Sequence, residues 1–301
     1  MHGEIIKDKF IKKENTHSFP SITREELRNI LSELIKEFGR EKFIGLGISI
    51  TGLVNNEKKV IQFSPNIPNF NDVDIVKEFE EPLGIPTYVD TSARCLALAE
   101  QRHGFGKEYK NQIFISVGHS ISAGIIINNH LFNGSTGTAG EIGHVRCGSD
   151  RIRCTCGNYD CLEVYSTLSI ITGKVAKKAH EFHGYSPTAN LVSDISDFDI
   201  EHVVKGIELK DKIVLECLQD AGSRIGFAIS HLINALNPEI IIFGGSVTEY
   251  LPQVIDEAIN QINKTGLISA VQNLEFKKST LGYKAAIIGS AIQVSNSFFG
   301  V

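Results

Sequence analysis

The sequence predicts an α/β protein built from two domains, and three observations lead to this prediction. Helical and strand patterns alternate from one end of the chain to the other. Two short apolar runs, FIGLGISI at 43–50 and EIIIF at 239–243, are typical of buried strands. The 301 residues, 42% of them hydrophobic, are enough for two domains that each bury a core.

The first hundred residues contain the clearest helix signal. Thr23 and Glu26 form a capping-box pattern that predicts a helix from there to Phe38, with Gly39 as its C-cap. Before it, residues 4–11 are predicted to form a strand, and 43–50 form a strand after it. The further elements predicted in this part are a helix at 73–80 that stops before Pro82, a strand at 87–90 and a helix at 93–103.

The remainder of the chain continues the alternation. Asn128 and Asn129 suit a type I′ turn, which predicts a hairpin between the strand at 123–127 and residues 130–132. The other predicted elements are a strand at 112–117, helices at 162–179 and 213–236, the strand at 239–243 that leads into Gly244 and Gly245, and a last helix at 285–296.

Composition and charge exclude some functions. The net charge of −5 argues against a broad nucleic-acid-binding surface within these residues. No apolar run approaches the ~20 residues that span a bilayer. The N-terminus, Met1 to Glu4, has no secretory-signal pattern. A cytoplasmic protein that does not contact membranes is the expectation.

A cluster of sulfur and imidazole side chains predicts a metal site. The pattern is His144-x9-Cys154-x-Cys156-x4-Cys161. A Cys3His set fills the tetrahedron of zinc, and thiolate ligands favour zinc over magnesium or calcium. Because no position is left for water, the zinc is predicted to be structural rather than catalytic.

Other interpretations of the cysteines stay open. The cluster could consist of reduced cysteines in a surface loop, although free cysteine prefers burial and this segment is polar. Cys147 could replace Cys154 as a ligand. Cys95 and Cys217 lie in helical patterns and are most simply core residues.

The same segment resembles the ROK family of bacterial sugar kinases and sugar-responsive transcriptional repressors. The resemblance rests on GEIGH at 140–144, CTCGN at 154–158 and CLE at 161–163. Further stretches similar to the family are GISITGLV at 47–54, SPNIP at 64–68, the segment from Asn237 to Gly245, and residues 281–291.

The resemblance implies an actin-like, ribonuclease-H-like fold of two domains around a central cleft, with a zinc-binding loop. Residues 1–108 plus 283–301 would form the smaller domain, and 109–282 the larger one. The residues that would contact a sugar are Asn66, Glu141, His144 and Glu163. Taken alone, Glu141 would be a solvated loop acid and Glu163 a helix-start acid favoured by the helix dipole.

The chain also departs from the pattern of the family's kinases. Those kinases hold phosphates with an Asp-x-Gly-Gly-Thr loop near their start, and this loop is not expected here because the chain begins after that point. Their general base corresponds to Ser92, whose hydroxyl cannot replace a carboxylate. Asp90 is a weak substitute that would need a shifted backbone. The second phosphate loop keeps only its outer glycines, Gly118 and Gly124.

We therefore expect the sugar-binding effector domain of a ROK-type regulator that is inactive as a kinase. It would bind a sugar or sugar phosphate, form a homodimer or homotetramer, and reach DNA only through a module that these residues do not contain. The alternative is an ATP-dependent kinase of hexoses or amino sugars that uses ATP and Mg²⁺, for which Gly118, Gly244 and Gly245 are nucleotide-side remnants. A third possibility is an interaction protein with a vestigial site.

Overall fold

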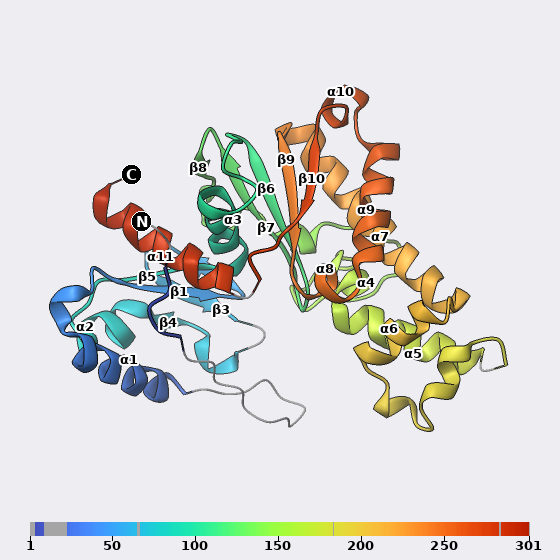
Figure 1. Cartoon of the computed structure of the whole chain (residues 1–301), viewed down its shortest axis with the longest axis horizontal. Helices are drawn as coiled ribbons and strands as arrows, with labels where there is room; N and C mark the ends of the chain where they lie inside the picture. Colours follow the sequence, from blue (N-terminus) through green and yellow to red (C-terminus); the bar gives the residue numbers. More distant parts are fainter. Residues whose placement is uncertain (1–3, 9–22, 65–66, 183, 283, 301) are drawn as a thin grey trace. The chain divides into compact units, whose positions relative to one another are not determined.

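A computed structural model describes residues 4–8, 23–64, 67–182, 184–282 and 284–300 (Figure 1). It divides the chain into two compact units. Unit 1 contains residues 1–108, 124–139 and 280–301, and unit 2 contains residues 109–123 and 140–279. The boundary thus crosses one strand, β7, at Gly124.

Unit 1 contains two small sheets. The helices and strands of its N-terminal part are α1 (Arg24–Phe38), β1 (Leu46–Ile50), β2 (Leu53–Asn55), β3 (Val60–Phe63), β4 (Val73–Asp74), α2 (Glu81–Leu83), β5 (Thr87–Thr91) and α3 (Ser92–His103). Strands β1 and β5 pair in parallel, whereas β2, β3 and β4 form an antiparallel sheet. The closing helix is α11 (Lys284–Phe299), which packs on α3 and β1.

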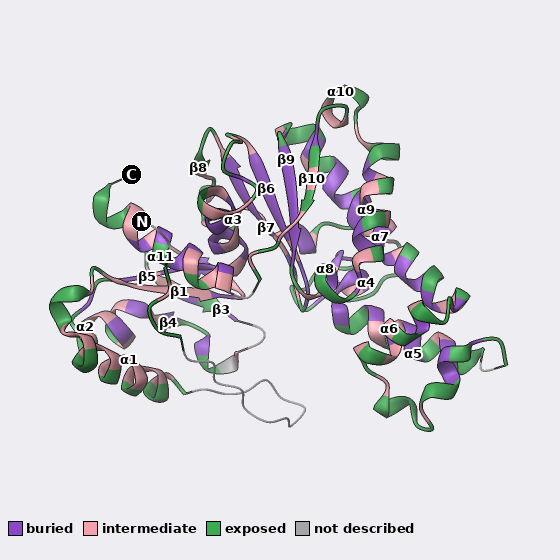
Figure 2. Ribbon diagram, viewed as in Figure 1, coloured by how far each residue is buried: buried purple, intermediate pink, exposed green. Residues whose placement is uncertain are grey.

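The core of unit 1 lies between these elements. Its buried members are aliphatic and aromatic side chains such as Val54, Ile61, Ile75 and Phe79. Helix α1 covers this core with Leu27 and Leu31, but it has no fully buried residue, so it is a surface helix (Figure 2). Thr23 and Glu26 form the predicted capping box, and Gly39 caps the end with φ 87°.

Unit 2 is centred on three parallel strands covered by helices. Its strands are β6 (Gln112–Val117), β9 (Ile240–Gly244), β10 (Glu275–Lys278) and the start of β7 (Ile121–Ile127). Its helices are α4 (Glu163–Ser166), α5 (Leu168–Glu181), α6 (Ile200–Glu208), α7 (Lys212–Leu236), α8 (Ser246–Tyr250), α9 (Pro252–Thr265) and α10 (Ile268–Val271). Strand β9 is buried along its whole length, as an interior parallel strand requires (Figure 2).

The order of the strands brings the carboxyl ends of two parallel strands next to each other. The sheet runs β10-β9-β6-β7-β8, where β8 is His130–Leu131 and β6 and β9 are parallel. The register pairs Ser116 with Gly244, so the carboxyl ends of β6 and β9 lie next to each other. Loops at such ends are the usual place for ligands in α/β sheets.

Several predicted elements agree closely with the structure. The strand at 112–117 is β6, and the helix predicted at 213–236 is α7, which begins one residue earlier. Asn128 and Asn129 have φ of 51° and 69°, which is the conformation that a type I′ turn needs. The predicted strand 43–50 begins later, at Leu46.

Two predictions in the N-terminal part were wrong. The strand predicted at 4–11 is wrong over its described part, because residues 4–8 form no strand, and Ile6 is 84% exposed while Lys7 pairs with Glu37 of α1. Residues 9–11 of this prediction lie outside the described residues. The helix expected at 73–80 begins as strand β4 and continues as a π-helical turn at Val76–Glu80. The chain then stays helical through Pro82, because Pro82 lies in the first turn of α2, where its missing N–H costs little.

The helix predicted at 162–179 is also interrupted. Thr167 adopts an extended conformation, with ψ 160°, between α4 and α5. The amide of Leu168 donates instead to the carbonyl of Gly118 at 2.8 Å. A contact between segments fifty residues apart therefore breaks a helix that local pattern alone favours.

The observed division of the chain differs from the expected domains at two places, because the last segment of unit 1 begins at residue 280 instead of 283 and an internal segment also belongs to unit 1. Residues 124–139 belong to unit 1, whereas we expected the whole range 109–282 in one domain. Gly124 explains the difference, because a Cβ there would lie 2.3 Å from the carbonyl oxygen of Ala93. This strand glycine lets β7 pack directly on α3, and Gln101 of α3 also donates to the carbonyl of Asn129.

Candidate metal and sugar site

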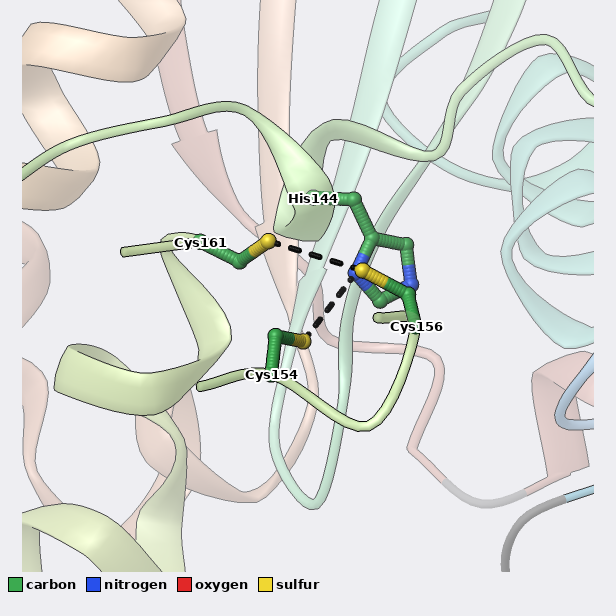
Figure 3. A group of neighbouring side chains, drawn as sticks. All are labelled: His144, Cys154, Cys156 and Cys161. Carbon is green, nitrogen blue, oxygen red and sulfur yellow. Dashed lines mark hydrogen bonds between the residues drawn. The ribbon is translucent and has the colours of Figure 1, made fainter. Parts of the chain in front are cut away.

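The four predicted metal ligands come together in unit 2 (Figure 3). His144 ends a short 3-10 turn, Ile142–His144, whereas Cys154 and Cys156 lie in the following loop. Cys161 lies two residues before α4. The ligand atoms of all four residues lie within 4.8 Å of one another. Three separate pieces of chain thus converge on one point.

The spacing of these atoms fits a tetrahedral ion. The Sγ atoms of Cys156 and Cys161 are 3.6 Å apart, and Sγ of Cys154 is 3.7 Å from Nδ1 of His144. Zinc–sulfur bonds of about 2.3 Å in a tetrahedron separate two ligand atoms by about 3.8 Å. The donor set and its spacing therefore fit zinc, with Nδ1 as the histidine ligand.

Hydrogen bonds within the cluster shift the pKa values of two of its thiols in opposite directions, and at Cys156 they lower the pKa against the effect of burial. Burial, followed by the neighbouring thiols of Cys156 and Cys154, raises the pKa of Cys161 to about 12. Zinc bound here would supply the positive charge that stabilises these thiolates. It would hold the loop in place as a structural ion.

The other cysteines stay outside the cluster. Cys147 is half-buried, and its thiol donates to the carbonyl of Val145 at 3.5 Å. Cys95 and Cys217 are buried in α3 and α7, in line with a packing role. Among the described residues, Cys154 rather than Cys147 is the one that joins the group of four.

A second set of contacts fixes the same loop. Asp160 is fully buried, and it accepts hydrogen bonds from the Tyr165 hydroxyl at 2.8 Å and the Ile152 amide at 2.9 Å. The guanidinium of Arg224 lies 4.0 Å from the centre of the Tyr165 ring and donates to the carbonyl of Cys147. The loop is therefore anchored to α4 and α7 as well as to the ligand cluster.

This anchor was not predicted from the sequence. Asp160 and Tyr165 are spaced like many pairs at a helix start, and nothing in the local pattern distinguishes them. The only signal was the position of Asp160 directly before a ligand, Cys161. Arg224 lies more than sixty residues away, so only the fold reveals that it belongs to the loop.

Glu141 and Glu163 flank the metal ligands. The nearest carboxylate oxygen of Glu141 lies 3.9 Å from Nε2 of His144, and both side chains are about one-third exposed. One carboxylate oxygen of Glu163 accepts a hydrogen bond from the amide of Ile121 at 2.7 Å. His144 can thus use Nδ1 for the metal and leave Nε2 beside the Glu141 carboxylate. Asn66, the fourth predicted sugar contact, lies outside the described residues.

Ser92 and Asp90, the two residues considered for the general-base position, lie in unit 1. Ser92 is the first residue of α3, and its hydroxyl lies 3.4 Å from that of Ser49. Asp90 is 1% exposed and forms a buried ion pair with Arg94. It also accepts hydrogen bonds from Asn56 and Gln293, each at 3.2 Å. Burial raises the pKa of Asp90 against the opposing effect of Arg94.

The glycines at the ends of β6 and β9 make a tight backbone junction. Gly245 has φ 92°, and a Cβ there would lie 2.5 Å from the carbonyl oxygen of Val117. A Cβ on Gly118 would lie 2.9 Å from the hydroxyl of Ser246, and one on Gly244 would lie 2.5 Å from the Phe114 ring. Close packing within unit 2 therefore accounts for all three glycines.

The comparisons with known proteins agree with this fold and site. The ROK family model matches residues 4–297, so the chain belongs to the ROK family. The xylose repressor of Bacillus subtilis (strain 168) is 27% identical over 300 residues, which cover 99% of this chain and 73% of the repressor. The glucokinase of Halalkalibacterium halodurans is 28% identical over 290 residues, which cover 95% of this chain and 87% of the glucokinase.

A solved structure of a ROK family protein is also similar to this chain. The crystal structure of a ROK family transcriptional regulator, a homologue of the E. coli Mlc protein, superposes with a TM-score of 0.79 at 26% identity. The match covers 93% of this chain and 71% of that protein. The fold is thus the actin-like α/β fold of ROK proteins, as the sequence predicted. No helix in the described residues has the length and apolar character to cross a bilayer.

Proposed function

We propose that this chain is the sugar-binding effector domain of a ROK-type transcriptional regulator and does not act as a kinase. The observation that carries the proposal is that Ser92 has no carboxylate and that the carboxylate of Asp90 is paired and buried. A serine occupies the position of the family's general base, and the nearest carboxylate along the strand is buried against Arg94. In the part of the chain that the structure describes, neither Ser92 nor Asp90 is poised to accept a proton from a sugar hydroxyl.

The sugar contacts in this proposal are Glu141, His144 and Glu163, joined by Asn66. Carboxylate oxygens and an imidazole nitrogen offer directional partners for vicinal hydroxyl groups. The Cys3His site would connect them, since His144 is itself a ligand and Cys161 is two residues from Glu163. Zinc at this site would thereby hold the sugar-binding side chains at a fixed separation.

The partners follow from the same proposal. The ligand would be a sugar or a sugar phosphate, and the domain would act in the cytoplasm as a homodimer or homotetramer. Contact with DNA would require a module outside these 301 residues. The similarity to a xylose repressor supports a regulator but does not identify the sugar.

The alternative is an ATP-dependent sugar kinase. One observation favours it: the Gly118 and Gly245 backbones lie at the carboxyl ends of paired parallel strands, a common place for phosphate groups. The similarity to a glucokinase is compatible with it as well. ATP and Mg²⁺ would then be needed.

Calorimetry and a coupled ATP assay distinguish the two functions. Glucose, xylose, N-acetylglucosamine and their 6-phosphates, where these exist, would be titrated into the zinc-loaded protein and tested for ATP turnover. We expect binding of at least one sugar without turnover. Glu141→Ala should weaken that binding by about tenfold, the loss of one charge-assisted contact.

The matched control is Glu216→Ala, which removes an exposed acid from α7 of the same unit. It should leave sugar affinity unchanged. ATP turnover that Glu141→Ala abolishes and Glu216→Ala preserves would instead establish the kinase. Absence of binding for every sugar would favour an interaction protein with a vestigial site.

A further inference from the structure

A cavity unrelated to the metal site lies within unit 1. Its volume is about 790 Å³, which falls within the ~300–1,000 Å³ typical of small-molecule sites. Its walls come from β5, α3, the turn between β7 and β8, and the last turns of α11. All of its lining residues belong to unit 1, whereas Glu141, His144 and Glu163 belong to unit 2.

The charge of this cavity is opposite to that of the chain. Its lining contains the cations Lys59, Arg102 and Lys107, although the whole chain carries −5. Asp90 is the only carboxylate among the described lining residues, and Arg94 already pairs with it. A carboxylate ligand or a phosphate group would therefore meet net positive charge.

Two of the three cations are available to a ligand. Lys59 forms an ion pair with Glu80 at 2.8 Å. Arg102 and Lys107 are exposed, and within the described part of the chain neither forms an ion pair with a carboxylate; Arg102 makes only a 3.5 Å contact to the amide oxygen of Asn296. Arg102 and Lys107 are thus the natural anchors for an anionic group.

The remaining walls suit hydroxyl groups. Amide and hydroxyl side chains dominate them, namely Asn56, Gln101, Asn129, Asn133, Gln293, Asn296 and Ser297. In the residues that the structure describes, Oδ1 of Asn133 and Oε1 of Gln293 are buried acceptors without a hydrogen-bond partner. Unmet acceptors of this kind are unfavourable, so they favour a ligand that brings hydroxyl donors.

A smaller apolar surface completes the lining. Val89 and Leu98 are buried side chains, and Leu131 and the Tyr88 ring are half-buried. Such faces pack against the C–H surface of a sugar, while the amides bind its hydroxyl groups. The combination of cations, amides and a ring is unlike the metal-centred site of unit 2.

We propose that this cavity is a second small-molecule site that binds a polyhydroxylated anion, meaning a sugar phosphate or a sugar acid. The phosphate or carboxylate binds to Arg102 and Lys107, and the hydroxyl groups bind to the amide-rich wall that includes Asn133 and Gln293. The ligand connects α3, α11 and the β7–β8 turn, three segments that are far apart in the sequence.

Calorimetry on the full chain tests this site with four probes: glucose 6-phosphate, gluconate, glucose and inorganic phosphate. We expect glucose 6-phosphate or gluconate to bind in the presence of Glu141→Ala, because that substitution affects unit 2 alone. The comparison between these two probes decides between the sugar phosphate and the sugar acid. Glucose and inorganic phosphate should each bind at least about tenfold more weakly, since each supplies only half of the contacts.

The double variant Arg102→Glu/Lys107→Glu should weaken binding of the anionic probe by about tenfold or more. Lys110→Glu/Lys212→Glu reverses two exposed charges in unit 2 and should not change it. Asn133→Ala, which keeps the charges, should weaken glucose 6-phosphate but not inorganic phosphate.

Three results would overturn the proposal. One is that no anionic probe binds to the Glu141→Ala protein, which would assign any sugar phosphate binding to unit 2. The second is equal affinity for inorganic phosphate and glucose 6-phosphate, which would remove the role of the amide wall. The third is unchanged binding in Arg102→Glu/Lys107→Glu. The proposed function is tested separately by the uncharged sugars of its assay, whose binding should respond to Glu141→Ala. Binding of the 6-phosphates in that assay is assigned to one unit or the other by comparing Glu141→Ala with Arg102→Glu/Lys107→Glu.

Discussion

Two buried aspartates, one in each unit, have pKa values that are shifted in opposite directions. Asp160 in the metal-binding loop and Asp90 at the end of β5 are 0% and 1% exposed. Burial disfavours the charge of both. At Asp160 the hydrogen bonds from Ile152 and Tyr165, with help from Arg146, outweigh burial and lower the pKa. At Asp90 burial outweighs Arg94 and raises the pKa.

The difference reflects the backbone around each carboxylate. The metal-binding loop is irregular, with positive φ at Arg151 and Asp160, so its free amides can turn toward the carboxylate. Asp90 lies in a strand whose amides pair within the sheet, and among the described residues the backbone hydrogen bond that its carboxylate receives comes from Thr91. An irregular loop can thus direct backbone amides toward a buried carboxylate, but it depends on further contacts, such as those to a bound metal, to keep its conformation.

The largest expected effect is the loss of stability on removing a metal ligand, which tests whether the loop depends on the metal. Cys161→Ser should release zinc, measured by atomic emission, and lower the free energy of unfolding by about 5 kcal/mol, since loss of a structural metal is among the most damaging changes. Hydrogen exchange should accelerate in residues 142–165 but not in 87–103.

Cys147→Ser is the control, because this thiol is near the cluster but not part of it. It should keep the zinc content of the parent protein. If Cys161→Ser retained zinc and stability as well, the loop would hold its shape without metal, and the contrast between the two regions would disappear.

A smaller effect is expected from the ion pair in unit 1. Arg94→Leu leaves the Asp90 carboxylate buried without its partner and should cost about 3–4 kcal/mol in chemical denaturation. Arg102→Leu, which removes an exposed arginine from the same helix, should change stability by no more than about 0.5 kcal/mol. An equal loss of unfolding free energy in both variants would show that the buried carboxylate of Asp90 does not need the charge of Arg94.

The smallest effect is a pH dependence. Because the folded pKa of Asp90 is raised, its contribution to stability is complete below the unfolded value near 3.8 and is lost as pH rises through the folded pKa. Relative to Asp90→Asn, the parent protein should therefore lose stability over that interval. A stability difference between the two proteins that stays constant with pH would contradict the raised pKa.

Much of the fold could be predicted from local sequence patterns. The capping box at Thr23, the Asn128–Asn129 turn and the apolar runs of β6 and β9 each carry their signal within a few residues. The strand predicted over residues 4–8 and the uninterrupted helix predicted at 162–179 were wrong, because contacts with distant segments decide these elements. The side chain of Ile6 is 84% exposed, and the amide of Leu168 donates to the carbonyl of Gly118 instead of continuing a helix.

By itself, the sequence determined which atoms could bind a metal, because the chemistry of His144, Cys154, Cys156 and Cys161 and their spacing are local properties. It also determined that Ser92 carries no carboxylate. Only the tertiary structure decided that Gln293 donates to Asp90, that Arg224 anchors the metal-binding loop, and that Arg102 and Lys107 share a cavity with Asn133. The reason is that these interactions depend on which distant segments pack together, and a local pattern does not encode the distance between two side chains.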